Sequence, residues 1–334
     1  MNLSLTVNLS NTNVSSIVPI SITVAVGLPS SILGLILNII LLHIITMKKK
    51  LHKAVYILVW NLSFASCLFS FVYPAGLTFL AFTPPGTKLS YQSGSLMCKL
   101  SFYISDTFSS VCNLTLAVIS CERYDVIVSS TWFNYQSRFT NRKFMAIVIA
   151  SIWSIGLLVC IPDIIFTDSY IDAPVFCDIY QRNSGVQYYL TFFVIMVIIL
   201  PCLLMAYNYT KIVKYILRRI RPGCLSNQRK QLEMRQKRNL IHVLVLTTSV
   251  FLLCQLPHLI KTMVLSYSTI SLRQLEQYHF SVYVLSNITV PLTLLLTFIN
   301  PLIFLTYDRN IKEQFKQFLK CNRRCKVHES IRSK

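Results

Sequence analysis

A charged triplet, Glu122-Arg123-Tyr124, ends one of the long apolar segments of this chain. Cys98 lies 25 residues before Arg123 in the same segment. Charged side chains are costly at membrane depth, so a carboxylate beside a guanidinium there usually has a function, such as an ion pair that can switch. The alternative is an Arg that reaches the membrane interface beside a neutralising Glu. The triplet alone is compatible with both interpretations.

Further polar residues in the apolar segments are able to bind a ligand. Asp106 follows Cys98 by eight residues, and Gln255, His258 and Lys261 are spaced i, i+3 and i+6 in a later segment. Polar side chains that face the inside of a helical bundle are the usual ligand-binding groups. We therefore predict a pocket with these residues: Ser105, Asp106, Gln255, His258, Lys261 and Tyr283. For Asp106, an internal ion pair with Lys261 or His258 is the alternative.

The sequence gives no indication of catalysis. Its six histidines form no closely spaced ligand group, so we expect no metal site, no cofactor and no catalytic residue. A channel or secondary transporter is the competing class of membrane protein, but the chain lacks the internal repeats and paired broken helices that are common in transporters.

Composition identifies the elements that must position these residues. Hydrophobic residues make up 54% of the 334 residues and charged residues only 13%, whereas soluble domains have about 25% charged residues. A helix needs about 20 apolar residues to cross a membrane. Seven stretches reach that length: Ile17–Thr46, Ala54–Phe82, Ser95–Val128, Phe144–Phe166, Tyr188–Tyr209, Asn239–Leu265 and Phe280–Phe304.

The net charge of +20 indicates the orientation of these spans. Basic residues gather in four connecting or terminal regions: Lys48–Lys53, Arg138–Lys143, Lys211–Arg238 and Arg309–Lys334. By the positive-inside rule these regions are cytoplasmic, and the N-terminus is extracellular. This placement favours anionic membrane lipids over nucleic acid as the partner of the basic residues. Glycosylation sequons at Asn2, Asn8 and Asn13 agree with an extracellular tail.

On this topology, Cys98 and Cys177 are the only two extracellular cysteines among eleven. We expect them to form a disulfide that ties the loop around Cys177 to the top of the third helix. Cys321 and Cys325 follow a basic amphipathic segment on the cytoplasmic side, where they are candidates for palmitoylation. Ordinary reduced thiols are the alternative for these two residues.

The predicted fold is an all-α membrane protein. It has an extracellular glycosylated tail (1–16), a seven-transmembrane helix bundle (17–304), and a short amphipathic helix with a basic cytoplasmic tail (305–334). We expect a multi-pass protein of the cell membrane.

These seven spans, the Cys98–Cys177 pair and Glu122-Arg123-Tyr124 together resemble the rhodopsin-like G-protein-coupled receptors. The likeness covers roughly residues 17–320 and includes a landmark on every helix except the second. The additional matching residues are: Asn38, Trp153, Pro201, Tyr209, Phe251, Cys254, Pro257 and Asn300-Pro301-Leu302-Ile303-Phe304.

The resemblance implies a two-state bundle in which an extracellular ligand favours the outward swing of the sixth helix and the binding of a heterotrimeric G protein. Arg123 would pair with Glu122 at rest and turn toward Tyr209 when the receptor is active. Pro257 would supply a kink, although prolines are also tolerated in membrane helices without such a role. The implied switch and coupling residues are: Glu122, Arg123, Tyr124, Tyr209, Phe251, Pro257, Asn300 and Pro301.

Four positions depart from the family pattern. Ser66 replaces the sodium-binding aspartate, Gln255 a tryptophan, and Phe304 a tyrosine, while Lys237 stands where an acidic partner for Arg123 is often found. We expect weak sodium sensitivity and raised basal activity. The same losses also support impaired coupling, in which the chain scavenges ligand or partners another receptor without signalling.

The favoured ligand class is a peptide, and a lipid or a small metabolite is the alternative. The outer loop carries four aspartates against Arg182, an acidic rim that would attract a basic peptide; they are Asp163, Asp168, Asp172 and Asp178. An amine is disfavoured because Ser105 occupies the position of the ammonium-binding aspartate. Retinal is disfavoured because residues 280–304 contain no Lys.

Overall fold

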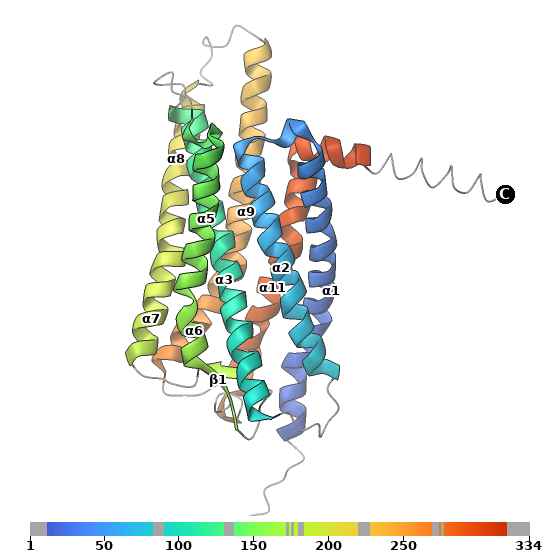
Figure 1. Cartoon of the computed structure of the whole chain (residues 1–334), viewed down its shortest axis with the longest axis vertical. Coiled ribbons are helices and arrows are strands. Elements are labelled where there is room, and N and C mark those ends of the chain that lie inside the picture. The colour runs from blue at the N-terminus through green and yellow to red at the C-terminus, as the bar shows by residue number, and fades with distance from the viewer. Residues whose placement is uncertain are drawn as a thin grey trace, which may run out of the picture.

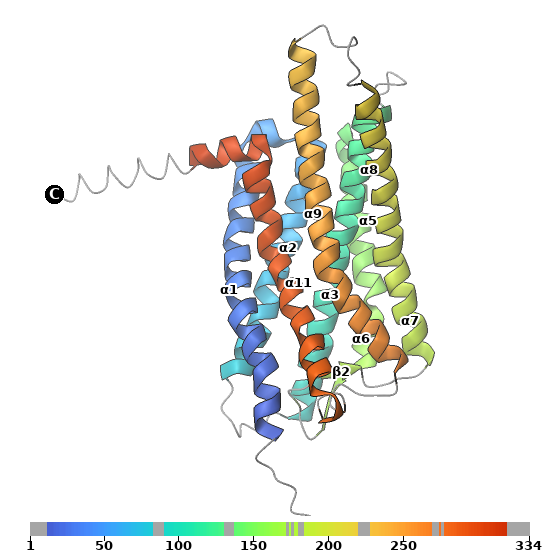
Figure 2. The ribbon, with the colours of Figure 1, turned by 180° about the vertical axis from the view of Figure 1, so that it is seen from behind.

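The computed structural model describes residues 12–82, 90–129, 137–171, 174, 177–179, 184–219, 228–268, 274 and 277–318. They form a bundle of long helices that lie side by side (Figures 1 and 2). The long elements are: α1 (Thr12–Met47), α2 (Ala54–Phe82), α3 (Tyr91–Tyr124), α5 (Arg142–Val159), α7 (Ser184–Val194), α8 (Leu200–Arg219), α9 (Gln228–Tyr267) and α11 (Phe280–Tyr307). The short helix α6 (Ile161–Phe166) continues the line of α5.

Four shorter helical elements connect or flank these helices. Two are π-helical turns, η2 (Asp125–Ser129) after α3 and η4 (Ile195–Ile199) between α7 and α8. The others are 3-10 turns, η1 (Lys49–Leu51) and η3 (Arg138–Thr140). Because η4 joins α7 to α8, these three elements make one rod, and the bundle has the predicted seven-helix architecture.

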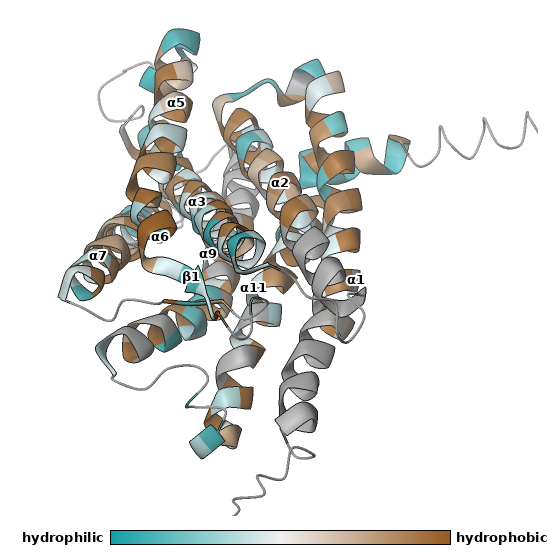
Figure 3. Cartoon of the chain, turned by 60° about the horizontal axis from the view of Figure 1, so that its bottom comes forward, coloured by the Kyte–Doolittle hydropathy of each residue, from teal (hydrophilic) through white to brown (hydrophobic). Residues whose placement is uncertain are grey.

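Membrane-spanning character is clear in the described part of the chain. Six helical segments there are long and apolar enough to cross a membrane. A seventh is added by the pair Pro291–Tyr307 and Arg309–Phe318, which bends by 92°. Hydrophobic residues recur along the helices in Figure 3, and many of the large apolar side chains, such as Leu203 and Leu253, are exposed. Such outward apolar faces suit contact with lipid.

The observed helices differ from the predicted spans mainly at their ends. The first helix begins at Thr12, so it includes the last residues of the predicted tail. The fourth span is divided at Cys160, where Pro162 in the first turn of α6 lacks an N–H and crowds the preceding turn. In contrast, α2 has the predicted bounds, and α8 and α9 extend beyond the predicted spans toward the cytosol, as Figure 1 shows.

A close contact between α1 and α11 explains the presence of one of the matching residues, Asn38. Asn38 on α1 donates from Nδ2 to the carbonyl oxygens of Gly34 and Thr297, each at 2.9 Å. A Cβ on Gly34 would lie 2.6 Å from Thr297 Oγ1 on α11, so only glycine fits this contact. Asn38 and Gly34 together hold α1 against α11.

A hydrogen-bonded chain joins three further helices. Trp153 Nε1 on α5 donates to Asn61 Oδ1 on α2 at 2.9 Å, and Asn61 Nδ2 donates to Thr115 Oγ1 on α3 at 2.9 Å. Asn61 is buried, so its polar groups are satisfied inside the bundle.

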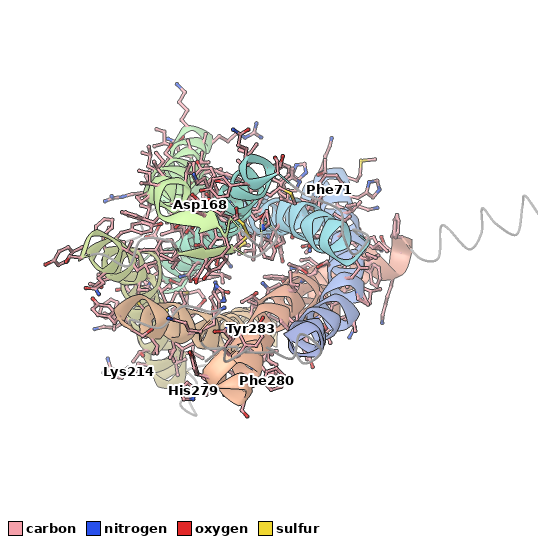
Figure 4. All side chains as sticks on the ribbon, turned by 90° about the horizontal axis from the view of Figure 1, so that it is seen from below. Phe71, Asp168, Lys214, His279, Phe280 and Tyr283 are labelled. Atoms are coloured by element: carbon pink, nitrogen blue, oxygen red, sulfur yellow. A yellow bond between two sulfur atoms is a disulfide. The ribbon has the colours of Figure 1, made fainter. Side chains whose placement is uncertain are left out.

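The extracellular end carries a small hairpin of β1 (Thr167–Ser169) and β2 (Cys177–Ile179), which pair antiparallel with Ser169 opposite Cys177. The predicted disulfide between Cys98 and Cys177 is present, with 5.3 Å between the Cα atoms. It ties β2 to α3 at the end of the bundle seen in Figure 4.

At the cytoplasmic end the chain turns after α11 into a helix over residues 309–318 that lies across the bundle axis (Figure 1). Ile311 is fully buried, and Phe315 and Phe318 are partly buried. The apolar face of this predicted amphipathic helix therefore packs against the bundle.

Candidate functional site

The cytoplasmic end of α3 holds the charge pair that the sequence predicted. Arg123 Nη2 donates to Glu122 Oε1 at 2.7 Å, and Arg123 Nε donates to Glu122 Oε2. The Glu122 side chain is 3% exposed and that of Arg123 is 11% exposed. A pair with two parallel N–H bonds in such a dry position is strong and geometrically specific. It is thus an internal ion pair and not an Arg that extends into water.

A second acidic residue lies near Arg123, and the sequence reasoning missed it. Asp308, just after α11, is within electrostatic range of Arg123 and is buried. Its Oδ1 accepts from the Ile311 N–H at 3.0 Å, and Tyr56 OH on α2 lies 3.4 Å from each carboxylate oxygen. Asn310 Nδ2 in turn donates to Tyr56 OH at 2.8 Å. These contacts join α2, α11 and the amphipathic helix.

Burial raises the pKa of the Asp308 carboxyl, while the backbone N–H groups of Ile311 and Asn310 oppose that rise. Its position directly after Asn300-Pro301-Leu302-Ile303-Phe304-Leu305-Thr306-Tyr307 was visible in the sequence. Nothing local, however, indicates that the bend at residue 308 turns this carboxylate back toward α3.

The remaining predicted switch residues lie on α3, α8, α9 and α11. Tyr209 OH lies 3.4 Å from Thr248 Oγ1 and links α8 to α9, while the ring of Tyr124 lies near that of Tyr207. Pro257 is inside α9, and Asn300 and Pro301 are inside α11. Phe251 and Lys237 belong to α9, but their side chains lie outside the described residues.

The outer half of the bundle contains a small cavity of about 30 Å³ between α3, α7, η4 and α9. Asp106, Gln255 and His258 from the predicted pocket line it. Ser105, Lys261 and Tyr283 are not among its lining residues. Tyr283 is buried on α11, across the ring of helices from Asp168 in Figure 4.

Two lining residues, Ser109 and Asn113, were not predicted. They follow Asp106 on α3 at i+3 and i+7, so one helical face carries all three, and this spacing was a usable signal. Gln255 Nε2 donates to Ser109 Oγ at 2.6 Å across the gap between α9 and α3. Asn113 Nδ2 donates to the carbonyl oxygen of Val197 in η4, where a π turn disturbs the regular hydrogen bonding.

Lys261 lies within electrostatic range of Asp178 and Asp106. In the part of the chain that the structure describes, no ion pair within 4.0 Å joins it to either carboxylate. The alternative of a close internal Asp106–Lys261 pair is therefore not realised in this conformation.

The predicted acidic rim is wrong for two of its four aspartates. Asp163 is 5% exposed in the first turn of α6 and accepts from Tyr189 OH at 2.8 Å. Asp178 is 6% exposed and accepts from Tyr170 OH at 2.6 Å. Both face inward because each belongs to a folded element instead of a free loop. Asp172 and Arg182 lie outside the described residues.

Asp168 is the aspartate that reaches the surface. It accepts from Tyr91 OH at 3.1 Å, and Lys99 Nζ lies 3.6 Å from its Oδ2. Partial burial acts to raise the pKa of this carboxyl, but hydrogen bonds from Ser95, the Ser169 N–H and Tyr91, with the charge of Lys99, lower it below the ordinary value.

Several predicted modification sites fall outside the described structure. Asn2, Asn8, Cys321 and Cys325 lie outside the described residues, and the side chain of Asn13, at the start of α1, does as well. Among the described residues, no three or more His, Cys, Asp or Glu side chains gather in a group that could hold a metal ion.

Comparisons with known proteins agree with this geometry. The family model of the 7 transmembrane receptors (rhodopsin family) matches residues 37–304. Neuropeptide Y receptor type 1 of Xenopus laevis is 25% identical over 301 residues, which cover 86% of this chain and 77% of that receptor. Prokineticin receptor 2 of Rattus norvegicus is 24% identical over 293 residues, which cover 84% and 72%.

Visual pigments are also similar. Short-wave-sensitive opsin 1 of Mus musculus is 25% identical over 231 residues, which cover 67% of this chain and 63% of the opsin. The crystal structure of squid rhodopsin superposes with a TM-score of 0.71 at 20% identity, over 92% of this chain and 87% of the rhodopsin chain. The likeness to the solved structure shows a common fold. Because the family model spans most of the chain, this multi-pass plasma-membrane protein belongs to the rhodopsin family of seven-transmembrane receptors.

Proposed function

We propose that this chain is a receptor that binds an extracellular ligand in the outer half of its bundle and activates a heterotrimeric G protein at its cytoplasmic end. The observation that carries this proposal is the buried Glu122–Arg123 pair, in which two N–H groups of Arg123 meet one carboxylate. A buried pair of this kind is a two-state element, because breaking it is costly unless another surface receives the guanidinium.

The path between the two ends runs along α3. This helix lines the outer cavity through Asp106, Ser109 and Asn113 and ends at Glu122 and Arg123. A ligand shifts the resting equilibrium only by its different affinity for the two states. A ligand that contacts α3 and α9 together would have such a preference if α9 moves on activation.

For the ligand class, a peptide is supported by two relatives: one is named a neuropeptide Y receptor and the other a prokineticin receptor. Asp168 at the extracellular rim offers an ionised carboxylate to a basic partner. A lipid or small metabolite is the second candidate, and the cavity's apolar wall of Leu190, Phe193 and Val197 favours it.

A panel of G-protein dissociation assays tests this proposal. The full-length chain is expressed alone and then as Arg123→Ala, with Arg309→Ala as a matched control because Arg309 is exposed and pairs with Glu313. We expect a ligand-independent signal from at least one G protein that Arg123→Ala abolishes and Arg309→Ala leaves unchanged. Absence of a signal from every G protein at normal surface expression would instead favour ligand scavenging or partnership with another receptor.

A further inference from the structure

The outer cavity presents hydrogen-bond acceptors along one face of α3. Asp106, Ser109 and Asn113 lie at i, i+3 and i+7 and all line the cavity, opposite Gln255 and His258 of α9. Gln255 Nε2 donates to Ser109 Oγ, so one N–H of this amide is engaged within the protein. Asp106 and Asn113 place carboxylate and amide oxygens on the α3 face of the cavity, where they can accept hydrogen bonds from an entering group.

One of these acceptors is buried and unsatisfied. Asn113 is 1% exposed, and its Oδ1 has no hydrogen-bond partner among the described residues. Its amide nitrogen is committed to the Val197 carbonyl, which fixes the orientation of the side chain and leaves Oδ1 as the free atom. A buried acceptor without a partner is costly, so the site favours an incoming N–H or O–H donor.

The acidic side chains around the cavity also have no close cationic partner among the described residues. Asp106 lies within electrostatic range of a second buried carboxylate, Asp163, whose Oδ2 has no hydrogen-bond partner among the described residues. Lys261 is the basic group in range of Asp106, but it is shared with Asp178 and makes no ion pair within 4.0 Å in the described structure. An anion in an apolar, membrane-embedded site is favoured by a cation brought to it.

From these observations we infer that the cavity binds a positively charged side chain of a basic peptide ligand, a guanidinium or an ammonium that carries several N–H donors. Asp106 accepts its charge-assisted hydrogen bonds, and Asn113 Oδ1 accepts a further N–H deeper in the bundle. A guanidinium suits this arrangement because its five donors point in fixed directions and it is only weakly hydrated. The inference rests on the proposed receptor function and specifies the chemistry of its ligand.

Small probes test this inference without knowledge of the natural ligand. The full-length receptor in lipid nanodiscs is titrated with N-acetyl-arginine amide, with its neutral isostere N-acetyl-citrulline amide, and with N-acetyl-lysine amide, at constant ionic strength. The readout is the midpoint temperature of unfolding. We expect the arginine probe to raise this midpoint and the citrulline probe to leave it unchanged, while the lysine probe shows whether an ammonium serves as well as a guanidinium.

Three variants locate the binding group. Asp106→Asn and Asn113→Leu should each weaken binding of the arginine probe. The probe concentration that gives half of the maximal midpoint shift should rise by at least about tenfold, because each variant removes a hydrogen bond to a charged group. Glu313→Gln, a carboxylate-to-amide change at the exposed cytoplasmic pair with Arg309, should leave it unaltered. Asn113→Leu keeps the inference testable if Asp106→Asn does not fold, since it removes the acceptor without changing any charge.

Three results would overturn the inference. The arginine and citrulline probes could shift the midpoint equally, neither the arginine nor the lysine probe could shift it, or sodium chloride alone could give the same shift. So would a response that survives both cavity variants. These results are distinct from failure of the proposed function. Probe binding without any G-protein signal would support this site but not the coupling role. A signal that Arg123→Ala abolishes, without probe binding, would support only the coupling role.

Discussion

At the cytoplasmic end of α3 the Glu122 carboxylate receives two N–H groups from Arg123, and nearby Asp308 receives the Ile311 N–H and lies close to Tyr56 OH. Toward the extracellular end of α3, Asp106 and Asp163 are two carboxylates within range of each other, with no ion pair within 4.0 Å in the described structure. The difference indicates that the cytoplasmic carboxylates are partnered in this structure, whereas Asp106 and Asp163 have no cationic partner within 4.0 Å among the described residues. Under the proposed function, Asp106 and Asp163 mark the place where a ligand adds a partner that the folded chain does not supply.

Glu122→Gln should have the largest effect. Removal of this carboxylate leaves the buried guanidinium of Arg123 without its pair, which costs about 3–5 kcal/mol in the free energy of unfolding. Basal nucleotide exchange by the G protein should rise, because the resting state loses its restraint. Thermal unfolding and exchange assays measure the two effects. Glu313→Gln is the matched control, since its exposed pair with Arg309 contributes only about 0.3–0.5 kcal/mol; equal losses in both variants would remove the distinction between the ends.

Tyr56→Phe tests the second cytoplasmic contact. Loss of the hydroxyl leaves the buried Asp308 carboxylate and the Asn310 amide without their shared partner, which should lower stability by about 1–3 kcal/mol. The amphipathic helix should also become more accessible to limited proteolysis. Tyr307→Phe, at an exposed tyrosine of the same region, serves as the control. An unchanged unfolding midpoint in Tyr56→Phe would show that the cytoplasmic end does not depend on this contact.

Asp163→Asn should act in the opposite direction to Glu122→Gln. The amide oxygen still accepts from Tyr189 OH, while the carboxyl group within electrostatic range of Asp106 becomes a neutral amide that cannot repel the Asp106 carboxylate. Relief of this repulsion should raise the stability of the ligand-free receptor by on the order of 1 kcal/mol. Thermal unfolding of Asp163→Asn and Glu122→Gln, measured side by side, is the sharpest test of the difference between the two ends. Destabilisation of both variants would contradict that difference.

Asp168→Asn should have the smallest effect, below about 1 kcal/mol, because its pair with Lys99 is partly exposed. The lowered pKa of Asp168 means that its contribution is present above the ordinary aspartate pKa of about 3.9 and is lost as the pH falls through the folded-state value. Stability measured down a pH series should therefore converge for Asp168→Asn and the parent chain at acidic pH. A difference that grows on acidification would contradict this assignment.

The sequence was informative where a local pattern or a count of residues contains the whole signal. The bounds of α2 agree with its apolar stretch, and the adjacent residues Glu122 and Arg123 form the pair that their types suggested. The Cys98–Cys177 disulfide followed from topology, because orientation left two extracellular cysteines. In each case a local pattern or a count was sufficient.

The site was harder to predict because it depends on the direction in which side chains point. Asp163 was assigned to an exposed rim, but the turn at Cys160 and Pro162 places it inside against Tyr189. Asn113 shares a helical face with Asp106, but its contact at the cavity depends on a π turn in another helix. Neither contact has a signature in its own segment.

The amino-acid sequence by itself determined the membrane class, the orientation and the seven-helix architecture, because transfer of apolar and charged groups between water and lipid depends on composition and segment length. Only the tertiary structure decided which buried charges are partnered. The bend at Asp308 returns a carboxylate to the vicinity of Arg123, while the packing of α3, α7, η4 and α9 leaves Asp106 and Asn113 facing a cavity. Hydrogen bonds act over a few ångströms, so their completion depends on helix rotation and register that the sequence pattern leaves open.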